Sequence, residues 1–174
     1  MKKFLFFLFL LTTPRLSPAI EVGDIYYSNK TFNNQLLEGL VPVGIVWQVN
    51  STKDSGLIMS LEQPGSKNWE KAQTYCRLYQ TRGTKSGDWF LPDLLQFFPI
   101  NKLQQQRVGA HTFLHLNDKL EKIKSARPLK NDTYLTSSDY AEDKNFAVGV
   151  KLSTGEIAKV KKKSRNSFRC MMSF

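Results

Sequence analysis

Residues 69–76 read WEKAQTYC, and they predict an amphipathic helix. Trp69, Ala72, Cys76 and Tyr79 follow one another at spacings of three, four and three residues, which is the periodicity of one helix face. Ser66 is expected to cap the start of this helix, because its hydroxyl can accept a hydrogen bond from a first-turn N–H. The sequence therefore places Cys76 on the buried side of a helix.

Alternating apolar residues predict β-strands on both sides of this helix. Apolar residues stand at every second position over 43–49, and a second apolar run follows at 57–61. Together they predict a hairpin with a long loop. Residues 146–152 alternate as well, and after a turn the chain returns at 157–160. The pattern predicts a mixed α+β domain without internal repeats.

The closing segment also alternates. Phe168, Cys170 and Met172 share one side of a predicted last strand, and Arg169 falls on the other side. Cys170 is thus expected to face inward, as Cys76 does. Two inward-facing cysteines meet the geometric requirement of a long-range disulfide.

The middle of the chain carries weaker patterns. Pro92 is expected at the first turn of a short helix. Leu116, Leu120 and Ile123 form an apolar stripe at helical spacing, which predicts a surface helix packed by that stripe.

Composition and the first residues indicate an exported globular protein. The 174 residues are 41% hydrophobic and carry a net charge of +10, which fits one folded domain. Lys2 and Lys3 precede the apolar run 4–11, and Ala19 ends a small-residue cleavage pattern. We expect a signal peptide at 1–19, a single domain at 20–174, and a location in the periplasm, at the cell surface or outside the cell. No later stretch has the length of a transmembrane segment.

Export makes a disulfide between Cys76 and Cys170 the expected state, because the periplasm and the cell exterior are oxidising. The alternative is a pair of independent buried thiols. A catalytic thiol is not expected, because no histidine stands near either cysteine in the sequence.

Several segments occur in an order typical of one protein family. These are VGDIYYSNKTFNN, VGIVWQV, SGLIMSLEQ, WEKAQTYC, GDWFLPDL, YLTSSDY and FRCMMSF. The chain from about residue 22 to its end resembles the Lcl C-terminal-type domain family of bacterial exported proteins. The resemblance implies a C-type-lectin-like fold with small antiparallel sheets, two main helices and a long loop region. It also implies a helix-to-last-strand disulfide and a role in adhesion or recognition.

The sequence departs from two related patterns. Gln63-Pro64-Gly65 lacks the third residue that calcium-dependent sugar-binding lectins carry, and it precedes the first helix. The additional cysteines of formylglycine-generating enzymes are missing. Motifs for hydrolases, phosphate loops, dinucleotides and zinc proteases are also absent from the sequence. We therefore expect a non-catalytic protein without a cofactor or a metal.

A basic segment near the C-terminus is the strongest candidate site. Its cations would attract sulfate, phosphate or carboxylate groups, and an arginine can bind such groups bidentately. A solvated loop that only confers solubility is the alternative. Tyr26, Tyr27 and Tyr140 stand among polar neighbours and are expected to be exposed. The candidate ligand-binding residues are Lys159, Lys161, Lys162, Lys163, Arg165 and Tyr140.

Three further patterns are weaker. A second basic stretch could extend the binding surface if it lies on the same side; its members are Lys119, Lys122, Lys124, Arg127 and Lys130. Oxygen donors crowd one loop and raise the possibility of calcium; they are Asp139, Glu142, Asp143 and Asn145. His111 and His115 are four residues apart, but no third zinc ligand accompanies them.

The sequence as a whole predicts an exported recognition or adhesion module that binds an anionic glycan or an acidic protein surface. Export argues against nucleic acid as the ligand, although the charge would suit it. The alternative function is a structural subunit of a cell-envelope or secretion assembly that binds other proteins and no glycan.

Overall fold

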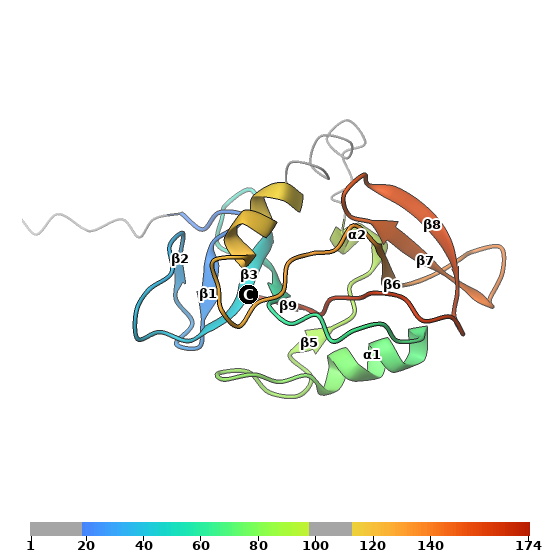
Figure 1. The fold of residues 1–174 in the computed structure, drawn as a ribbon, viewed down its shortest axis with the longest axis horizontal. Coiled ribbons are helices and arrows are strands. Elements are labelled where there is room, and N and C mark those ends of the chain that lie inside the picture. The colour runs from blue at the N-terminus through green and yellow to red at the C-terminus, as the bar shows by residue number, and fades with distance from the viewer. Residues whose placement is uncertain (1–18, 98–112) are drawn as a thin grey trace, which may run out of the picture.

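A computed structural model describes residues 19–97 and 113–174, which form two antiparallel sheets with helices packed against them (Figure 1). The predicted leader, apart from Ala19, lies outside the described residues, and so does His111. The strands are β1 (Ile25–Tyr27), β2 (Phe32–Asn33), β3 (Pro42–Val49), β4 (Gly56–Ser60), β5 (Trp89–Phe90), β6 (Thr133–Asp139), β7 (Phe146–Lys151), β8 (Glu156–Lys161) and β9 (Met171–Ser173). The helices are α1 (Trp69–Leu78), α2 (Leu94–Phe97) and a helix over residues 113–120.

The larger sheet joins both ends of the described chain. Its strand order is β2-β1-β3-β4-β9-β5, so β9 pairs with β4 of the early hairpin. The predicted β3–β4 hairpin is confirmed, with Ile45 opposite Met59. Gly44 is required where these strands meet, because a Cβ there would lie 2.2 Å from the Ile58 side chain and 2.8 Å from the Met59 carbonyl oxygen.

The smaller sheet has the order β6-β7-β8. The predicted β7–β8 hairpin is confirmed, with Phe146 opposite Lys161 and Lys151 opposite Glu156. Figure 1 shows this sheet beside the larger one, with β8 at its outer edge.

Helices cover both faces of the larger sheet. Ala72 and Cys76 of α1 pack in a cluster with Ile58, Trp89 and Met172. The helix at 113–120 lies across the opposite face (Figure 1). It packs through Leu116 and Leu120 of its predicted stripe, whereas Ile123 lies beyond the end of the helix and is buried in the same cluster. The chain is therefore an α+β protein, as expected.

The expected disulfide between Cys76 and Cys170 is confirmed. The two Cα atoms are 5.3 Å apart, although the residues are 94 positions apart in the chain. The bond ties α1 to the segment that leads into β9. Both cysteines are buried.

Local details of both helix starts differ from the predictions. Asn68, and not Ser66, caps α1, and its side chain accepts a hydrogen bond from the Lys71 N–H at 3.0 Å. Pro92 precedes α2, and Asp93 takes the capping position. Its carboxylate accepts from the Gln96 N–H at 2.8 Å, and the Gln96 side chain accepts from the Asp93 N–H at 2.7 Å. This reciprocal pair is a capping box.

The closing strand is shorter and more deeply buried than predicted. β9 begins at Met171, so Cys170 lies just before it. The predicted alternation of buried and outward residues is wrong, because Arg169 and Met171 are as buried as Phe168 and Cys170. The segment runs through the middle of the molecule, where neighbouring elements cover both of its sides.

Arg169 is the most unusual member of the core. Its Nη1 donates to the carbonyl oxygens of Ser60 and Leu61, each at 2.8 Å, and its Nη2 donates to the carbonyls of residues 127–128. Burial lowers the pKa of Arg169 to about 10, so the guanidinium remains charged at neutral pH. The side chain joins the end of β4 to the segment that follows the 113–120 helix.

Candidate functional site

A groove with a volume of about 430 Å³ lies where α1, β7 and β8 meet. The segments that form it are the start of α1, the start of β7 and the loop after β8. We call it the basic groove. Its lining residues are Trp69, Glu70, Lys144, Asn145, Phe146, Lys161, Lys162 and Lys163.

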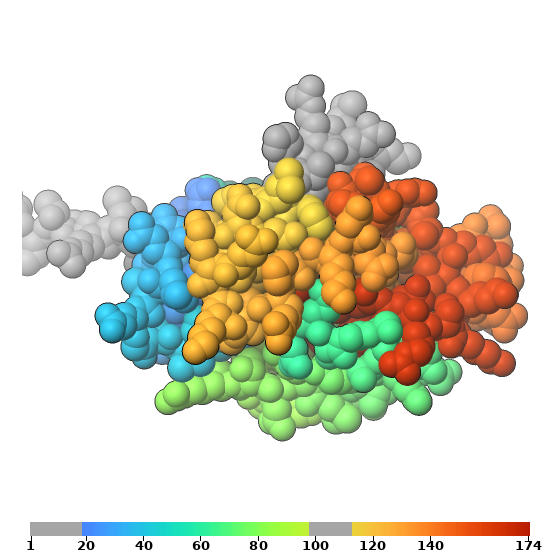
Figure 2. Space-filling model, in the orientation of Figure 1, coloured from blue at the N-terminus to red at the C-terminus, as the bar shows by residue number. Residues whose placement is uncertain are grey.

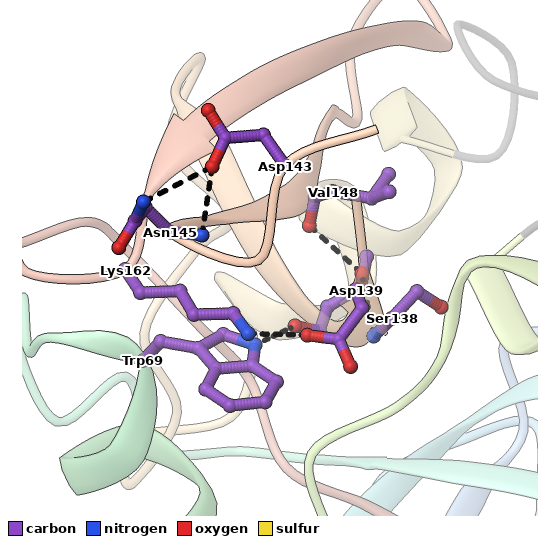
Figure 3. A network of polar contacts seen from close by, with 8 residues as sticks. Trp69, Ser138, Asp139, Asp143, Asn145, Val148 and Lys162 are labelled. Atoms are coloured by element: carbon purple, nitrogen blue, oxygen red, sulfur yellow. Dashed lines mark hydrogen bonds and ion pairs between the residues drawn. The ribbon is translucent and has the colours of Figure 1, made fainter. Parts of the chain in front are cut away.

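Trp69 forms a fixed wall of the basic groove. Its indole Nε1 donates to the Thr136 carbonyl oxygen at 2.8 Å, and the Thr136 hydroxyl donates to the Val148 carbonyl oxygen at 2.8 Å (Figure 3). The Trp69 backbone N–H also donates to the Lys162 carbonyl oxygen at 3.0 Å. These bonds hold α1 against the smaller sheet and set the position of the indole ring.

Lys162 is held in place by an aromatic ring and an acid. Its ammonium lies 4.1 Å from the centre of the Trp69 ring and pairs with the Asp139 carboxylate (Figure 3). The Lys162 side chain is 21% exposed, whereas that of Asp139 is 63% exposed. A cation over an indole is attracted by the negative face of the ring. Lys162 is therefore a positioned charge and not a mobile one.

Lys159, which lies within β8, is also held between aromatic rings and an acid. Its ammonium lies 4.1 Å from the centre of the Phe146 ring, 4.9 Å from that of Tyr140, and 3.7 Å from Asp143. A hydrogen bond from the Asn145 N–H lowers the pKa of Asp143, and the charge of Lys159 lowers it further. The prediction that Tyr140 is exposed is only partly met, because its ring is half-buried.

Three lysines of the basic groove are left for a ligand. Lys144, Lys161 and Lys163 are exposed, and none of them forms an ion pair with another described residue. Arg165 is also exposed, and its Nη2 donates to the Ser66 carbonyl oxygen at 2.9 Å. Two aromatic walls and several cations at one place could hold an anion that has an apolar face.

The structure brings the predicted site residues together only in part. Lys161, Lys162 and Lys163 line one groove, and Lys159 with Tyr140 forms the neighbouring cluster on β8. Arg165 reaches away, towards Ser66. The sequence analysis missed Lys144, Trp69 and Phe146 as members of the site. The pairing of Phe146 with Lys161 brings Phe146 and Lys144 near the loop, and the hydrogen bond from the Trp69 N–H to the Lys162 carbonyl oxygen brings Trp69 there.

No residue of the second basic stretch lines the basic groove, and segment 61–67 contacts both basic segments. The Arg127 N–H donates to the Leu61 carbonyl oxygen at 2.9 Å, and the Lys67 N–H donates to the Asn166 carbonyl oxygen at 3.1 Å. Both basic segments are visible on one face, in yellow-orange and in red (Figure 2). Lys119 points elsewhere, because its ammonium donates to the Asn34 carbonyl oxygen at 2.6 Å.

The prediction that Tyr26 and Tyr27 are exposed is wrong, and neither of them lines the basic groove. Tyr26 is 7% and Tyr27 0% exposed, because β1 lies between β2 and β3 and is covered on both faces. The Tyr27 hydroxyl donates to the Gln35 carbonyl oxygen and accepts from the Leu37 N–H.

Two of the oxygen donors that raised calcium as a ligand form ion pairs with lysines instead. Asp139 pairs with Lys162 and Asp143 with Lys159. Within residues 19–97 and 113–174, no three His, Cys, Asp or Glu side chains form a group that could hold a metal ion. His115 lies beside Gly23, and its proposed partner His111 falls outside this part of the chain.

Comparisons with family models and with curated proteins find no match to this chain. In the described part of the chain, no helix combines the length and the apolar character that crossing a membrane requires.

Proposed function

We propose that the chain is an exported, non-catalytic recognition module that binds an anionic ligand through the basic groove. The observation that carries the proposal is that Lys144, Lys161 and Lys163 line the same groove as Trp69. Lysines that stand next to a fixed aromatic wall can attract an anionic group while the wall contacts the apolar part of the same ligand. An acidic polysaccharide or an acidic protein surface has this chemistry.

The fold we propose for this module is C-type-lectin-like. Support comes from the disulfide between α1 and the segment before β9, and from a sheet that unites early and late strands. The buried disulfide also supports export, because such bonds persist in oxidising compartments.

The experiment is a charge-removal variant measured against a sulfated polymer. Lys161, Lys162, Lys163 and Arg165 are replaced together by Gln, and binding to dextran sulfate is measured by calorimetry at two salt concentrations. We expect affinity at low salt to fall about tenfold or more, because each exposed ionic contact contributes up to about 1 kcal/mol. The dependence on salt should also flatten, because fewer charges remain to be screened.

The matched control removes four exposed cations elsewhere. Lys53, Lys71, Arg77 and Arg82 are replaced by Gln, which changes the net charge equally. This variant should bind dextran sulfate almost as the parent does. The proposal fails if the parent ignores dextran sulfate, or if the control loses as much affinity as the groove variant.

A second prediction concerns Asp139, whose carboxylate forms an ion pair with the Lys162 ammonium. Asp139→Asn should raise the affinity for dextran sulfate about two- to fivefold, because the exposed ion pair no longer competes with the ligand. The comparison is Glu142→Gln, which removes one negative charge from the same loop at an exposed position. Equal gains in both variants would mean that only net charge matters.

The alternative function, a subunit of an envelope assembly, is favoured by one feature. A groove of about 500 Å³ lies between the loop before β3 and the segment after the 113–120 helix. Leu36 is 50% exposed and Leu37 36% exposed at this groove. Exposed apolar side chains in one patch are typical of protein interfaces. A purified chain that binds no glycan but associates with envelope proteins would favour this function.

A further inference from the structure

A second hollow lies away from the basic groove. It has a volume of about 810 Å³ and is bounded by β1, β2, β9 and β5 and by the loop at 83–88. This volume is in the range of small-molecule sites. We call it the aromatic groove. The residues that matter for its chemistry are Tyr26, Phe32, Phe90, Phe174 and the charged residues of its rim.

Aromatic rings line the aromatic groove. The Tyr26 and Phe32 ring centres are 5.0 Å apart, and those of Phe32 and Phe174 are 4.8 Å apart. Phe32, Phe90 and Phe174 are only half-buried. α1 ends at Leu78, so it does not cover this end of the sheet. The rings therefore keep part of their surface open to a ligand.

The rim carries charges of both signs in equal number. Its charged residues are Lys30, Lys85, Asp54 and Asp88. Hydrogen bonds hold both carboxylates: Asp54 Oδ1 accepts from Asn50 and Thr52, and Asp88 Oδ2 accepts from the Lys85 N–H at 2.8 Å. Within the described residues these bonds use one oxygen of each carboxylate, which leaves the other oxygen able to accept from a ligand.

The two grooves thus differ in charge. The basic groove has four lysines and one glutamate, whereas the charges of the aromatic groove balance. Burial raises the pKa of Tyr26, and the nearby charge of Asp88 raises it further. This agrees with the position of Asp88 in the rim, close to the Tyr26 ring. Nothing in the rim favours an anion over a neutral ligand.

We propose that the aromatic groove binds a neutral saccharide. A sugar ring has an apolar C–H face, which can stack on an aromatic side chain, and hydroxyls that both donate and accept hydrogen bonds. The lysines of the rim supply donors and the aspartates supply acceptors. A purely apolar peptide side chain would contact the rings but leave these four charged groups without partners. This inference does not depend on the function proposed for the basic groove.

The experiment uses an array of neutral oligosaccharides built from hexoses and N-acetylhexosamines, followed by calorimetry of the bound sugars. Phe32→Ala and Phe174→Ala should each lower the affinity about three- to tenfold, because one stacking partner is removed. Raising the salt concentration should change the affinity little. The fourfold Gln variant of the basic groove should bind as the parent does.

Lys85→Ala serves as the second test, because Lys85 is exposed and its removal leaves the packing intact. It should also weaken binding, and circular dichroism checks that every variant is folded. The inference is overturned if no neutral oligosaccharide binds. It is overturned equally if these three variants bind as the parent does, or if binding is lost in the basic-groove variant instead.

Discussion

Cys76→Ala combined with Cys170→Ala is expected to lower the free energy of unfolding by about 4 kcal/mol. The bond closes a loop of 94 positions, and a long closed loop restricts the unfolded chain strongly. Both cysteines are buried, so alanine introduces no buried polar group there. Urea unfolding monitored by tryptophan fluorescence measures the change.

Reduced parent protein is the control for this experiment. It has the same side chains as the parent but lacks the cross-link, so its unfolding midpoint should fall close to that of the double alanine variant. Midpoints that coincide for oxidised parent, reduced parent and double variant would contradict the prediction. The experiment would then show that packing alone holds α1 against the segment before β9.

Arg169→Met is expected to cost about 3 kcal/mol or more of folding free energy. Methionine fills much of the same space but donates no hydrogen bonds. The carbonyl oxygens of Ser60 and of residues 127–128 then lose a charged donor inside the core, and each unsatisfied buried group costs about 1–3 kcal/mol. Thermal and urea unfolding of the variant give the value.

Arg169→Lys distinguishes the loss of hydrogen bonds from the loss of charge. A lysine retains the charge, but its single ammonium cannot reach the acceptors on both sides that the forked guanidinium joins. Its stability should lie between those of the parent and Arg169→Met. A methionine variant as stable as the parent would mean that the cost of desolvating the arginine offsets its hydrogen bonds.

Predictions from local periodicity succeeded where one element covers one face of another. The β3–β4 and β7–β8 hairpins, the buried face of α1 and the apolar stripe at Leu116, Leu120 and Ile123 all follow from spacing. The pairing of Cys76 with Cys170 followed because both faced inward. The alternation predicted around Arg169 failed, and so did the exposure of Tyr26 and Tyr27 that was predicted from their polar neighbours, because other chain segments cover both sides of these residues.

The candidate site could be predicted only as a cluster of charges. The run of cations at 159–165 is visible in the sequence, but its division into paired and unpaired lysines is not. Asp139 forms an ion pair with Lys162, and Asp143 forms one with Lys159. Both acids lie about twenty residues earlier in the chain than the lysines. Trp69 reaches the same place from the start of α1, more than ninety residues away. The aromatic groove had no signal in the sequence.

The sequence by itself determined the α+β class, most of the strands and the cysteine pair, because these depend on spacing along the chain. The tertiary structure alone decided that Arg169 lies in the core, that Tyr26 and Tyr27 are covered, and which lysines face a groove. Burial and ion pairing depend on which distant segments meet. The physical reason is that the pattern of apolar residues in a segment does not show which distant segments will contact its side chains across a sheet or a groove.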